Sequence, residues 1–394
     1  MAAWDLAVVG AGPAGTAAAL GALHAEPGLR VALLDRADFP RDKACGDGVA
    51  PHVLDRLAEV GVTGLLDDRV PVARLRLDRD GQAVDRTMPR PSYVVPRRLF
   101  DARLVEAARA AGAHLLRHRV RDVEVGTDGR DGAVVLDRGL DDTLDAEVVV
   151  GADGAHSVLG RRLGRRAGGT ALALRGYAPV SAGREGAQAI VFGTGPTTAY
   201  AWSFDRGDGL ANVGYGEVLD RGRGPSRARM LAQLEALLPG ATDGGGDWLA
   251  HHLPLSGPRW RPPSGRVLLV GDAAGLVNPV TGEGIYYAVA TGLAAGRAAA
   301  AALARGRPRA AGRDYARAAR AHLFPHLRHT AAAAALSRRG PLLEAGLRAS
   351  AADQRVFDDL VELGLARGRI TPAVARGLLG ALLRPGAPAG GEAA

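Results

Sequence analysis

Two residues with distinctive chemistry lie two positions apart in the segment Lys43-Ala44-Cys45-Gly46-Asp47-Gly48. They are the only lysine and the only cysteine of the 394-residue chain, in which every other basic residue is Arg. An ammonium group in a chain that otherwise uses guanidinium groups indicates a local requirement for a compact charge. A thiol beside glycines can approach a bound molecule closely, or it can pack as a small buried residue. We therefore expect a site at this segment, with chance placement as the alternative.

A glycine-rich segment near the N-terminus, Gly10-Ala11-Gly12-Pro13-Ala14-Gly15, has the spacing of a dinucleotide cradle. Gly10 permits a tight turn, Gly12 lets a diphosphate approach the backbone, and Gly15 lets a helix pack closely on the preceding strand. The free N–H groups at the start of that helix would face phosphate oxygens. Asp35 lies twenty residues past Gly15, where a carboxylate accepts hydrogen bonds from ribose hydroxyls and disfavours a 2′-phosphate. The alternative is an ordinary turn in a chain with 55 glycines.

Two later strands each end in a glycine-flanked aspartate, Asp153 and Asp272. Asp272 can bind a ribityl hydroxyl, and the helix that follows can stabilise negative charge on a flavin ring. The segment Tyr93–Asp101 brings Arg97 to a helix start, where its guanidinium could contact a cofactor phosphate or ring. Each segment alone also fits an ordinary turn or a solvated helix start. Their order predicts FAD rather than NAD as the resident cofactor, because an NAD dehydrogenase needs only the first segment.

The predicted cofactor site combines residues from all of these segments. It requires no metal, because a single cysteine cannot build a Cys-based metal cage. The residues expected to contact the cofactor are Gly10, Gly12, Pro13, Ala14, Gly15, Asp35, Arg36, Lys43, Cys45, Gly46, Arg97, Asp153, Gly271, Asp272, Gly282, Gly284 and Ile285.

Alternating strands and helices must position these residues. Strands over 5–9 and 30–35 flank a helix over 13–24, which together make a β-α-β unit of about 30 residues. Short alternating segments with many turn residues over 171–260 predict an antiparallel sheet. The remaining expected elements are a helix over 98–113, strand-like runs over 114–126, 132–138 and 145–151, a strand over 265–271, a helix from about Gly284, and helices over 296–383 broken at Pro308, Pro325, Pro341 and Pro372.

The composition limits the classes of function. The formal net charge of +8 comes from an Arg-rich, Ala- and Gly-rich chain with little Lys or Asn, which is typical of a GC-rich genome. No nucleic-acid-binding motif accompanies that charge, so we expect no nucleic-acid partner. The glycine-interrupted N-terminus does not fit a signal peptide, and no apolar window of about 18 to 20 residues predicts a membrane span. The single cysteine fits a reducing cytoplasm.

Taken together, the segments GAGPAG, KACGDG, YVVPRRLFD, VVVGADGAHS and GDAAGLVNPVTGEG resemble the geranylgeranyl reductase family, a branch of the para-hydroxybenzoate hydroxylase-like flavoproteins. The resemblance spans about residues 4–295. Aromatic-ring hydroxylases of that fold usually carry His where Gly275 stands and GQG where Gly282-Glu283-Gly284 stands, so this chain follows the reductase pattern. The segment Tyr200–Phe204 is similar to the Tyr-x-Trp-x-Phe element of the family, although Asp205 stands where the family has Pro.

The resemblance implies an α/β fold: a Rossmann-like FAD-binding domain of the GR2 or para-hydroxybenzoate hydroxylase type, an antiparallel-sheet substrate domain and C-terminal helices. The corresponding predicted domain boundaries are 1–70, 94–170 and 262–300 for the FAD-binding domain, 71–93 and 171–261 for the sheet domain, 301–384 for the helical region, and 385–394 for a disordered tail.

The resemblance also implies a reaction. Reduced FAD delivers hydride to a C=C bond of an isoprenoid chain on a lipid or quinone, and a protein group supplies a proton. NADPH or another reductant reduces the flavin. The candidate proton donors are Cys45, Tyr215 and Glu283. Tyr200, Trp202 and Phe204 share one strand face and are expected to line an apolar pocket, with a sheet core as the alternative.

Other functions remain open on the sequence. A flavin monooxygenase or epoxidase of natural-product biosynthesis uses the same fold, and fold alone does not decide function. A halogenase is disfavoured because its Trp-x-Trp-x-Ile-Pro element and later catalytic Lys are absent from the sequence. A lipid- or quinone-binding protein that keeps FAD structurally is a non-enzymatic alternative. For the Arg-rich C-terminal helices there are three alternatives: they cap the substrate tunnel, they contact an anionic membrane peripherally, or they are simply solvated. The sequence leaves the oligomeric state open.

Overall fold

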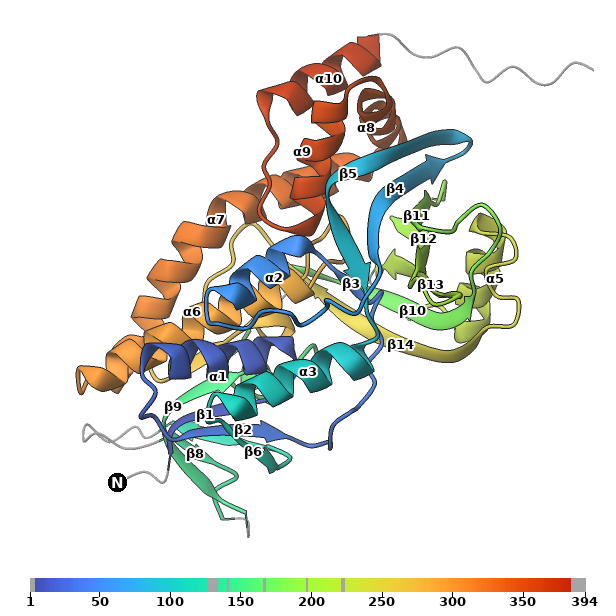
Figure 1. Ribbon diagram of the computed structural model, residues 1–394. Helices are drawn as coiled ribbons and strands as arrows, with labels where there is room; N and C mark the ends of the chain where they lie inside the picture. Colours follow the sequence, from blue (N-terminus) through green and yellow to red (C-terminus); the bar gives the residue numbers. More distant parts are fainter. Residues whose placement is uncertain are drawn as a thin grey trace, which may run out of the picture.

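The computed structural model describes residues 4–125, 134–139, 142–165, 168–195, 198–220 and 224–383. The predicted tail, 385–394, lies outside these ranges. Figure 1 shows two β-sheets, with one group of helices packed on the first sheet and a second group, from the C-terminal part of the chain, beside the other. The cavity that holds the candidate site lies where these parts meet.

The first sheet has a parallel centre, in the order β6 (His114–Arg117), β2 (Val31–Asp35), β1 (Trp4–Val9), β9 (Leu144–Gly151), with β15 (Val267–Leu269) also pairing with β9. β2 is buried along its whole length, which is typical of a parallel strand covered on both faces. The strand-like run expected over 114–126 is interrupted: β6 ends at Arg117 and β7 (Val123–Val125) forms an antiparallel edge with β8 (Val134–Leu136).

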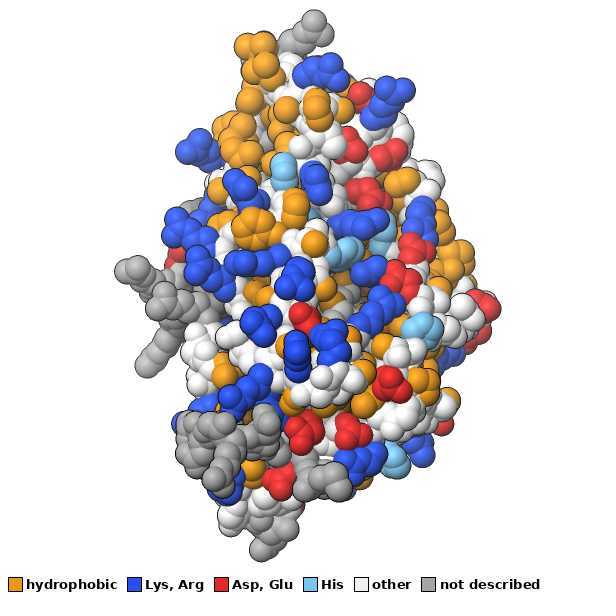
Figure 2. Space-filling model, turned by 90° about the vertical axis from the view of Figure 1, so that its left-hand side faces the viewer, with side chains coloured by type: hydrophobic (Ala, Val, Ile, Leu, Met, Phe, Trp, Pro, Cys, Tyr) orange, Lys and Arg blue, Asp and Glu red, His pale blue; other side chains and the backbone are white. Residues whose placement is uncertain are grey.

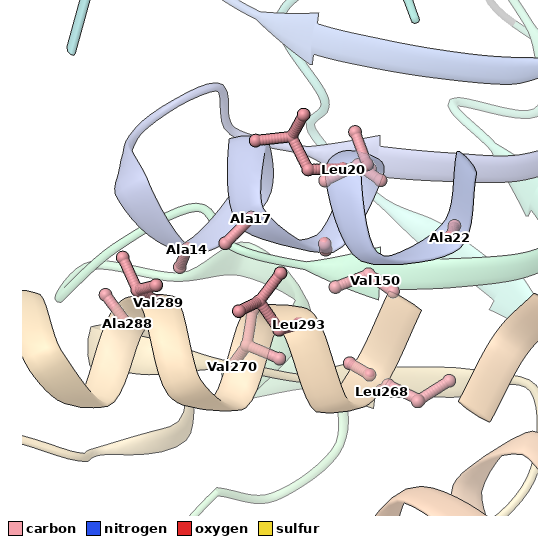
Figure 3. Packing of buried hydrophobic residues seen from close by; sticks show 14 of the residues in the cluster. Ala14, Ala17, Leu20, Ala22, Val150, Leu268, Val270, Ala288, Val289 and Leu293 are labelled. Atoms are coloured by element: carbon pink, nitrogen blue, oxygen red, sulfur yellow. The ribbon is translucent and has the colours of Figure 1, made fainter. Parts of the chain in front are cut away.

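Small residues allow two helices on this sheet to pack closely against each other. α1 (Pro13–Ala25) and α6 (Ile285–Ala304) are in contact along their length, and Figure 3 shows Ala14 and Ala17 of α1 close to Val289 and Leu293 of α6. A Cβ on Gly292 or Gly296 would collide with the backbone of α1, so only glycine fits there. This packing fixes the N-terminus of α1 beside that of α6.

α6 is long and apolar enough to cross a membrane by length and composition alone. Most of that helix is buried inside the protein, against α1 and α7 (Ala311–Ser337). Its apolar character is therefore explained by its place in the core. α3 (Arg97–Ala110) also packs against α1, and the short α2 (Pro51–Ala58) packs against α6.

The second sheet is mixed rather than purely antiparallel as predicted. Its order is β14 (Gly246–Leu255), β10 (Gly169–Pro179), β13 (Leu210–Val218), β12 (Ala199–Asp205), β11 (Ala187–Phe192), β4 (Pro71–Arg79), β5 (Gln82–Val94) and β3 (Gly48–Val49). β4 runs parallel to β11, because the β4–β5 hairpin enters the sheet from a distant part of the chain. α5 (Arg227–Leu237), which the alternation pattern did not predict, covers one face.

The C-terminal part is helical, as expected, but one predicted break is wrong. α7 continues through Pro325, while Pro341 and Pro372 lie at the starts of α8 (Gly340–Ala352) and α10 (Pro372–Leu383). Leu323, His326 and Leu327 are buried on either side of Pro325, and this packing outweighs the single backbone hydrogen bond that proline removes. α8 and α9 (Gln354–Leu365) contact β5 and so attach the helical part to the second sheet.

Candidate functional site

One continuous cavity with a volume of about 1080 Å³ connects the three parts of the structure. One end lies at the carboxyl ends of β1, β2 and β9, beside the N-terminus of α1. The cavity then passes between the second sheet and the loop before α6, and it ends among α7, α8, α9 and α10. Its first end is polar and charged, and its far end is apolar.

The glycines around the start of α1 shape the polar end. A Cβ on Gly10, whose φ is +101°, would collide with the carbonyl of Ala152, and one on Gly15 would collide with the carbonyl of Gly10. In front of Gly12 there is space, bounded only by guanidinium nitrogens of Arg41 and Arg97, at 3.4 and 3.7 Å from an added Cβ. Within the described part of the chain, no side-chain hydrogen bond caps the N-terminus of α1. Free N–H groups and two cations facing one open cradle fit the diphosphate of a dinucleotide.

Buried ion pairs hold those two cations in place. Arg97 donates to both oxygens of Asp101, at 2.6 and 2.8 Å, and Arg41 lies 3.2 Å from the same carboxylate. Arg41 also lies 3.6 Å from Asp35, whose Oδ2 accepts a hydrogen bond from the Ala11 N–H at 2.9 Å. Asp35 therefore faces the cavity from the end of β2, in a position suited to a ribose.

Asp272, which follows β15, is largely buried, with 14% of its side chain exposed, and is paired with the single lysine. Its Oδ2 accepts a hydrogen bond from Lys43 Nζ at 3.2 Å. Burial works to raise the pKa of Asp272, but the Lys43 ammonium outweighs it, so this pKa lies below its ordinary value. His251 of β14 lines the same region, and burial together with the Lys43 charge lowers its pKa to about 4. Asp272 is thus an ionised acceptor in the wall of the cavity.

The loop before α6 brings a protonatable acid to the cavity. Glu283 accepts a hydrogen bond from the Tyr286 N–H at 2.7 Å, at the start of α6. Burial raises the pKa of Glu283 to about 7, so close to neutral pH a large part of this side chain is uncharged. Tyr200 holds the loop by donating to the carbonyl of Thr281 at 2.6 Å, and Gly282 and Gly284 complete the wall.

Cys45 lines the cavity, and the residue after it lies against an aromatic surface on β12. Tyr200, Trp202 and Phe204 lie in a row, with ring centroids 5.8 and 6.3 Å apart, and all three line the cavity. The backbone at Gly46 lies against this row, because a Cβ there would be 3.5 Å from the Phe204 ring. Burial raises the pKa of the Cys45 thiol, and the nearby Arg97 charge opposes that rise. A protonated thiol beside a guanidinium and an apolar face therefore line the same part of the cavity.

Tyr215 lies on the other face of the sheet and is not a candidate proton donor. Along β13 the side chains of Val213 and Tyr215 pack with Met230 and Leu234 of α5, away from the cavity. The Tyr215 hydroxyl donates to Glu217 at 2.8 Å. The side-chain period of two along a strand puts Asn212 and the glycines of β13 on the cavity face instead. The structure therefore corrects the expectation for Tyr215.

The far arm of the cavity is lined mainly by apolar side chains from the second sheet and the C-terminal helices. Among the polar side chains in this wall, Gln188 donates to Ser92 Oγ at 2.9 Å, and Ser337 and Ser350 line the helical end. The apolar lining residues include Leu75, Leu77, Met88, Ile190, Phe192, Leu253, Leu342, Leu343, Leu347, Phe357, Leu360, Val361, Ile370, Val374 and Leu378. Such an arm suits a long hydrocarbon chain.

The structure brings most of the predicted site residues together in this cavity. Gly15 and Gly271 contribute through packing, since Gly15 lies under Gly10, and Gly271 lies against α6. The remaining predicted residues that line the cavity are Gly10, Gly12, Pro13, Ala14, Asp35, Arg36, Lys43, Cys45, Gly46, Arg97, Asp153, Tyr200, Trp202, Phe204, Asp272, Gly282, Glu283, Gly284 and Ile285.

Sequence reasoning missed several contributors to the site. Asp101 follows Arg97 by four residues, a spacing that places both on one helix face, so the pair was detectable. Arg41, two residues before the only lysine, could also have been identified from the sequence. The apolar arm could not be predicted, because its lining residues come from strands and helices far apart in the chain.

The comparisons with known proteins agree with this geometry. Residues 3–200 match the family described as "FAD binding domain". The chain is 37% identical to a menaquinone reductase from Mycolicibacterium smegmatis, over 73% of this chain and 74% of that one. It is 31% identical to a digeranylgeranylglycerophospholipid reductase from Methanothrix thermoacetophila, over 77% and 79%. A geranylgeranyl bacteriochlorophyll reductase-like protein from Thermoplasma acidophilum shares the fold, with a TM-score of 0.74, 21% identity and coverage of 96% and 95%.

Proposed function

Because this chain belongs to the geranylgeranyl reductase family of FAD-dependent oxidoreductases, we propose that it saturates C=C bonds in the isoprenoid chain of a quinone or lipid. The observation that carries the proposal is the continuity of the cavity. The cradle that fits the cofactor opens directly into an apolar arm. The relatives named above act on a menaquinone and on a geranylgeranyl lipid, both of which carry isoprenoid chains.

The chemistry that FAD would supply when bound here is hydride transfer from its reduced form. The N–H groups of α1 would hold the cofactor together with Arg41 and Arg97 at the diphosphate, and Asp35 and Asp272 would accept hydrogen bonds from its hydroxyl groups. While Glu283 is uncharged, the N-terminus of α6 stays available to stabilise negative charge on the cofactor.

Cys45 is the proposed proton donor. Its burial keeps the sulfur protonated, and the Arg97 guanidinium beside it stabilises the thiolate left after the proton has gone to carbon. The aromatic row of Tyr200, Trp202 and Phe204 presses the isoprenoid chain against this point and excludes water. An unactivated alkene needs this positioning, because no carbonyl group stabilises charge on the substrate.

NADPH is the proposed electron donor. Arg36, Arg119 and Arg161 line the charged end of the cavity and offer positive charge to a phosphorylated dinucleotide. Mixing the flavin-loaded protein with NADPH under anaerobic conditions should bleach the flavin absorbance. Bleaching by dithionite but not by NADPH would assign another donor.

The experiment that tests the function uses anaerobic, reduced protein and a menaquinone with an unsaturated side chain. Mass spectrometry should find products heavier by two hydrogens per reduced bond, with no oxygen consumed. Product that forms only with O2, and that carries its oxygen atom, would identify a monooxygenase instead. Because the fold serves both reactions, this outcome decides between them.

We also propose that the far arm of the cavity opens toward an anionic membrane. Leu336 lines the cavity and is 38% exposed, so the cavity reaches the surface beside the end of α7. On α10, Leu378 lines the cavity, whereas Leu379, Leu382 and Leu383 are exposed. Residues 315–352 contain six arginines and one acidic residue. Figure 2 shows basic side chains gathered on one face of the molecule, with hydrophobic side chains toward its top.

Vesicle flotation tests this surface. The protein should float with phosphatidylglycerol vesicles and not with phosphatidylcholine vesicles, and it should be released by high salt. The double variant Leu379→Ser/Leu383→Ser should float several-fold less. Val70→Ser is the matched control, because Val70 is also exposed but is far from α10 in the sequence. This variant should leave flotation unchanged. Equal flotation of all variants would remove α10 from the contact.

A further inference from the structure

Asn212 connects the Cys45 segment to the second sheet through three hydrogen bonds. Its Nδ2 donates to the carbonyl of Cys45 at 2.9 Å and to Asp47 Oδ2 at 2.8 Å. Its Oδ1 accepts from Trp202 Nε1 at 2.8 Å. A single buried amide therefore fixes the thiol segment and the central ring of the aromatic row relative to one another.

Asp47 is the other half of this arrangement. It is completely buried, its φ is +58°, and its Oδ2 also accepts a hydrogen bond from the Tyr177 hydroxyl at 2.5 Å. The Tyr177 ring lies between the guanidinium groups of Arg175 and Arg206, which are 4.5 and 4.8 Å from its centroid. The second oxygen, Oδ1, is buried, and none of the residues that the structure describes gives it a hydrogen-bond partner. An incompletely satisfied carboxylate in a left-handed conformation is costly, which indicates a role beyond packing.

The charged groups that face the thiol come from more than one element. Arg97 of α3 and Lys43 of the same segment favour the thiolate, whereas Asp47 favours the thiol. Glu283, before α6, and Cys45 both act on Tyr200, so this acid also lies in the neighbourhood. Two cations would make Cys45 easy to ionise, and Asp47 is the anion in its own segment that opposes them.

We propose that Asp47, held by Asn212 and Tyr177, is a positioning residue that places Cys45 and keeps its sulfur in the thiol form. The proposal rests on the function above only in giving that thiol the role of proton source. Burial raises the pKa of Asp47 to about 6, although the hydrogen bonds from Tyr177 and Asn212 oppose that rise. The ionisation of Cys45 should therefore respond to the titration of a carboxyl group near pH 6.

Alkylation of the flavin-loaded protein by iodoacetamide measures this directly, because Cys45 is the only thiol in the chain. The thiolate displaces iodide and forms a thioether, so the logarithm of the rate rises with pH as the thiolate fraction grows. In the unaltered protein the rise should flatten near pH 6, where Asp47 becomes charged and makes the thiol harder to ionise. Above and below that range the rise resumes with a normal slope.

Asp47→Asn is the central variant, because Asn tolerates the same backbone conformation and keeps the acceptor for Tyr177 and Asn212. For this variant, the logarithm of the alkylation rate should rise with pH in a straight line. At pH 7.5 its alkylation should be roughly threefold faster, or more, than that of the unaltered protein, as expected for loss of one nearby charge. Asp38→Asn, which removes a carboxylate that is 71% exposed, is the matched control and should reproduce the unaltered profile.

Tyr177→Phe keeps the proposal testable if Asp47→Asn does not fold. Removing the hydroxyl takes away a hydrogen bond that lowers the pKa of Asp47, so the flattening should move to higher pH. A straight profile in the unaltered protein, or one that neither variant changes, would overturn the proposal. Neither result depends on prenyl reduction, so a failure of the proposed function stays distinguishable from a failure here.

Discussion

The ammonium group of Lys43 lies 3.2 Å from Asp272 Oδ2, and this pair joins two segments 229 positions apart in the chain. One segment contains the only thiol, and the other follows the last strand of the first sheet. The pair therefore connects the group proposed to donate the proton to the wall of the cofactor site. It also gives a physical reason for the single lysine in an Arg-rich chain, since a compact ammonium fits a partly buried position beside a carboxylate.

Replacing Lys43 by Met should weaken both cofactor binding and folding. Asp272 would then be a largely buried carboxylate without its cation. The free energy of unfolding at pH 7 should fall by about 1–2 kcal/mol, a figure kept small because both side chains are partly exposed. Burial works to raise the pKa of Asp272, but the Lys43 charge outweighs it and lowers this pKa. The pair therefore stabilises the folded state fully at pH values above the ordinary pKa of Asp, and this stabilisation is lost as the pH falls through the lowered pKa. Urea unfolding at several pH values measures this.

Lys43→Arg is the informative control for that experiment. It keeps the charge but changes the shape of the cation, so stability should be largely retained while FAD affinity, measured by flavin fluorescence, should fall. Equal affinity of Lys43→Arg and the unaltered protein would show that charge alone matters at this position.

The sequence could identify Lys43, Cys45 and Asp272 as candidate site residues, but it could not predict that Lys43 and Asp272 are in contact. The composition singled out Lys43 and Cys45, and the Gly-Asp pattern singled out Asp272, because those signals are local. The Lys43–Asp272 pair depends on the closure of two sheets against one another, which no local pattern contains. The same limit applies to Asn212, whose partners in the Cys45 segment are 165 and 167 positions away.

Local patterns were reliable where backbone physics decides the outcome, and weaker where packing decides it. The strand–turn–helix around Gly10 and the alternation of Tyr200, Trp202 and Phe204 follow from φ preferences and from the period of two along a strand. Tyr215 had the right type for a proton donor, but its register on β13 sends it to the opposite face. Pro325 looked like a helix end, yet tertiary contacts keep α7 intact through it.

Gly12→Val should abolish tight FAD binding without unfolding the protein. The space in front of Gly12 contains only the ends of two flexible guanidinium groups, so a larger side chain fits the protein but occupies the place of the diphosphate. We expect FAD affinity to fall by at least about tenfold, or more than 1.4 kcal/mol. Isothermal titration of the flavin-free protein measures it.

Gly28→Val is the matched control for that variant, since Gly28 lies just beyond the other end of α1 with open space around it. Its FAD affinity and thermal midpoint should both be unchanged. Unimpaired FAD binding by Gly12→Val would contradict the assignment of the cradle.

Gly214→Ala should displace Trp202 from the aromatic row. The indole lies against Gly214, and an added Cβ would collide both with its ring and with the carbonyl of Leu174. We expect a loss of stability of about 1–3 kcal/mol and a shift in the tryptophan fluorescence maximum, because overpacking forces side chains off their rotamers. Turnover of a prenyl substrate should fall further than stability does.

Gly216→Ala lies on the same strand and the same face, where its Cβ would be in ordinary contact with Ala173 at 3.6 Å. This control should not show the fluorescence shift, and its turnover should fall less than that of Gly214→Ala. If the two variants behave alike, Gly214 serves only the strand and not the aromatic row.

Glu283→Gln should remove a pH dependence from the reaction. Burial raises the pKa of Glu283 to about 7, so below that pH the side chain is neutral, and above it the carboxylate places a negative charge at the N-terminus of α6. That charge competes with negative charge on the bound cofactor for the same N–H groups. In anaerobic single turnovers, the rate for the unaltered protein should fall as the pH rises through about 7, whereas the rate for the Gln variant should stay level.

Cys45→Ala should instead lower the rate at every pH, because the proposed proton donor is gone. If Glu283→Gln lowers the rate uniformly and Cys45→Ala alone levels the profile, the two residues exchange the roles given to them here.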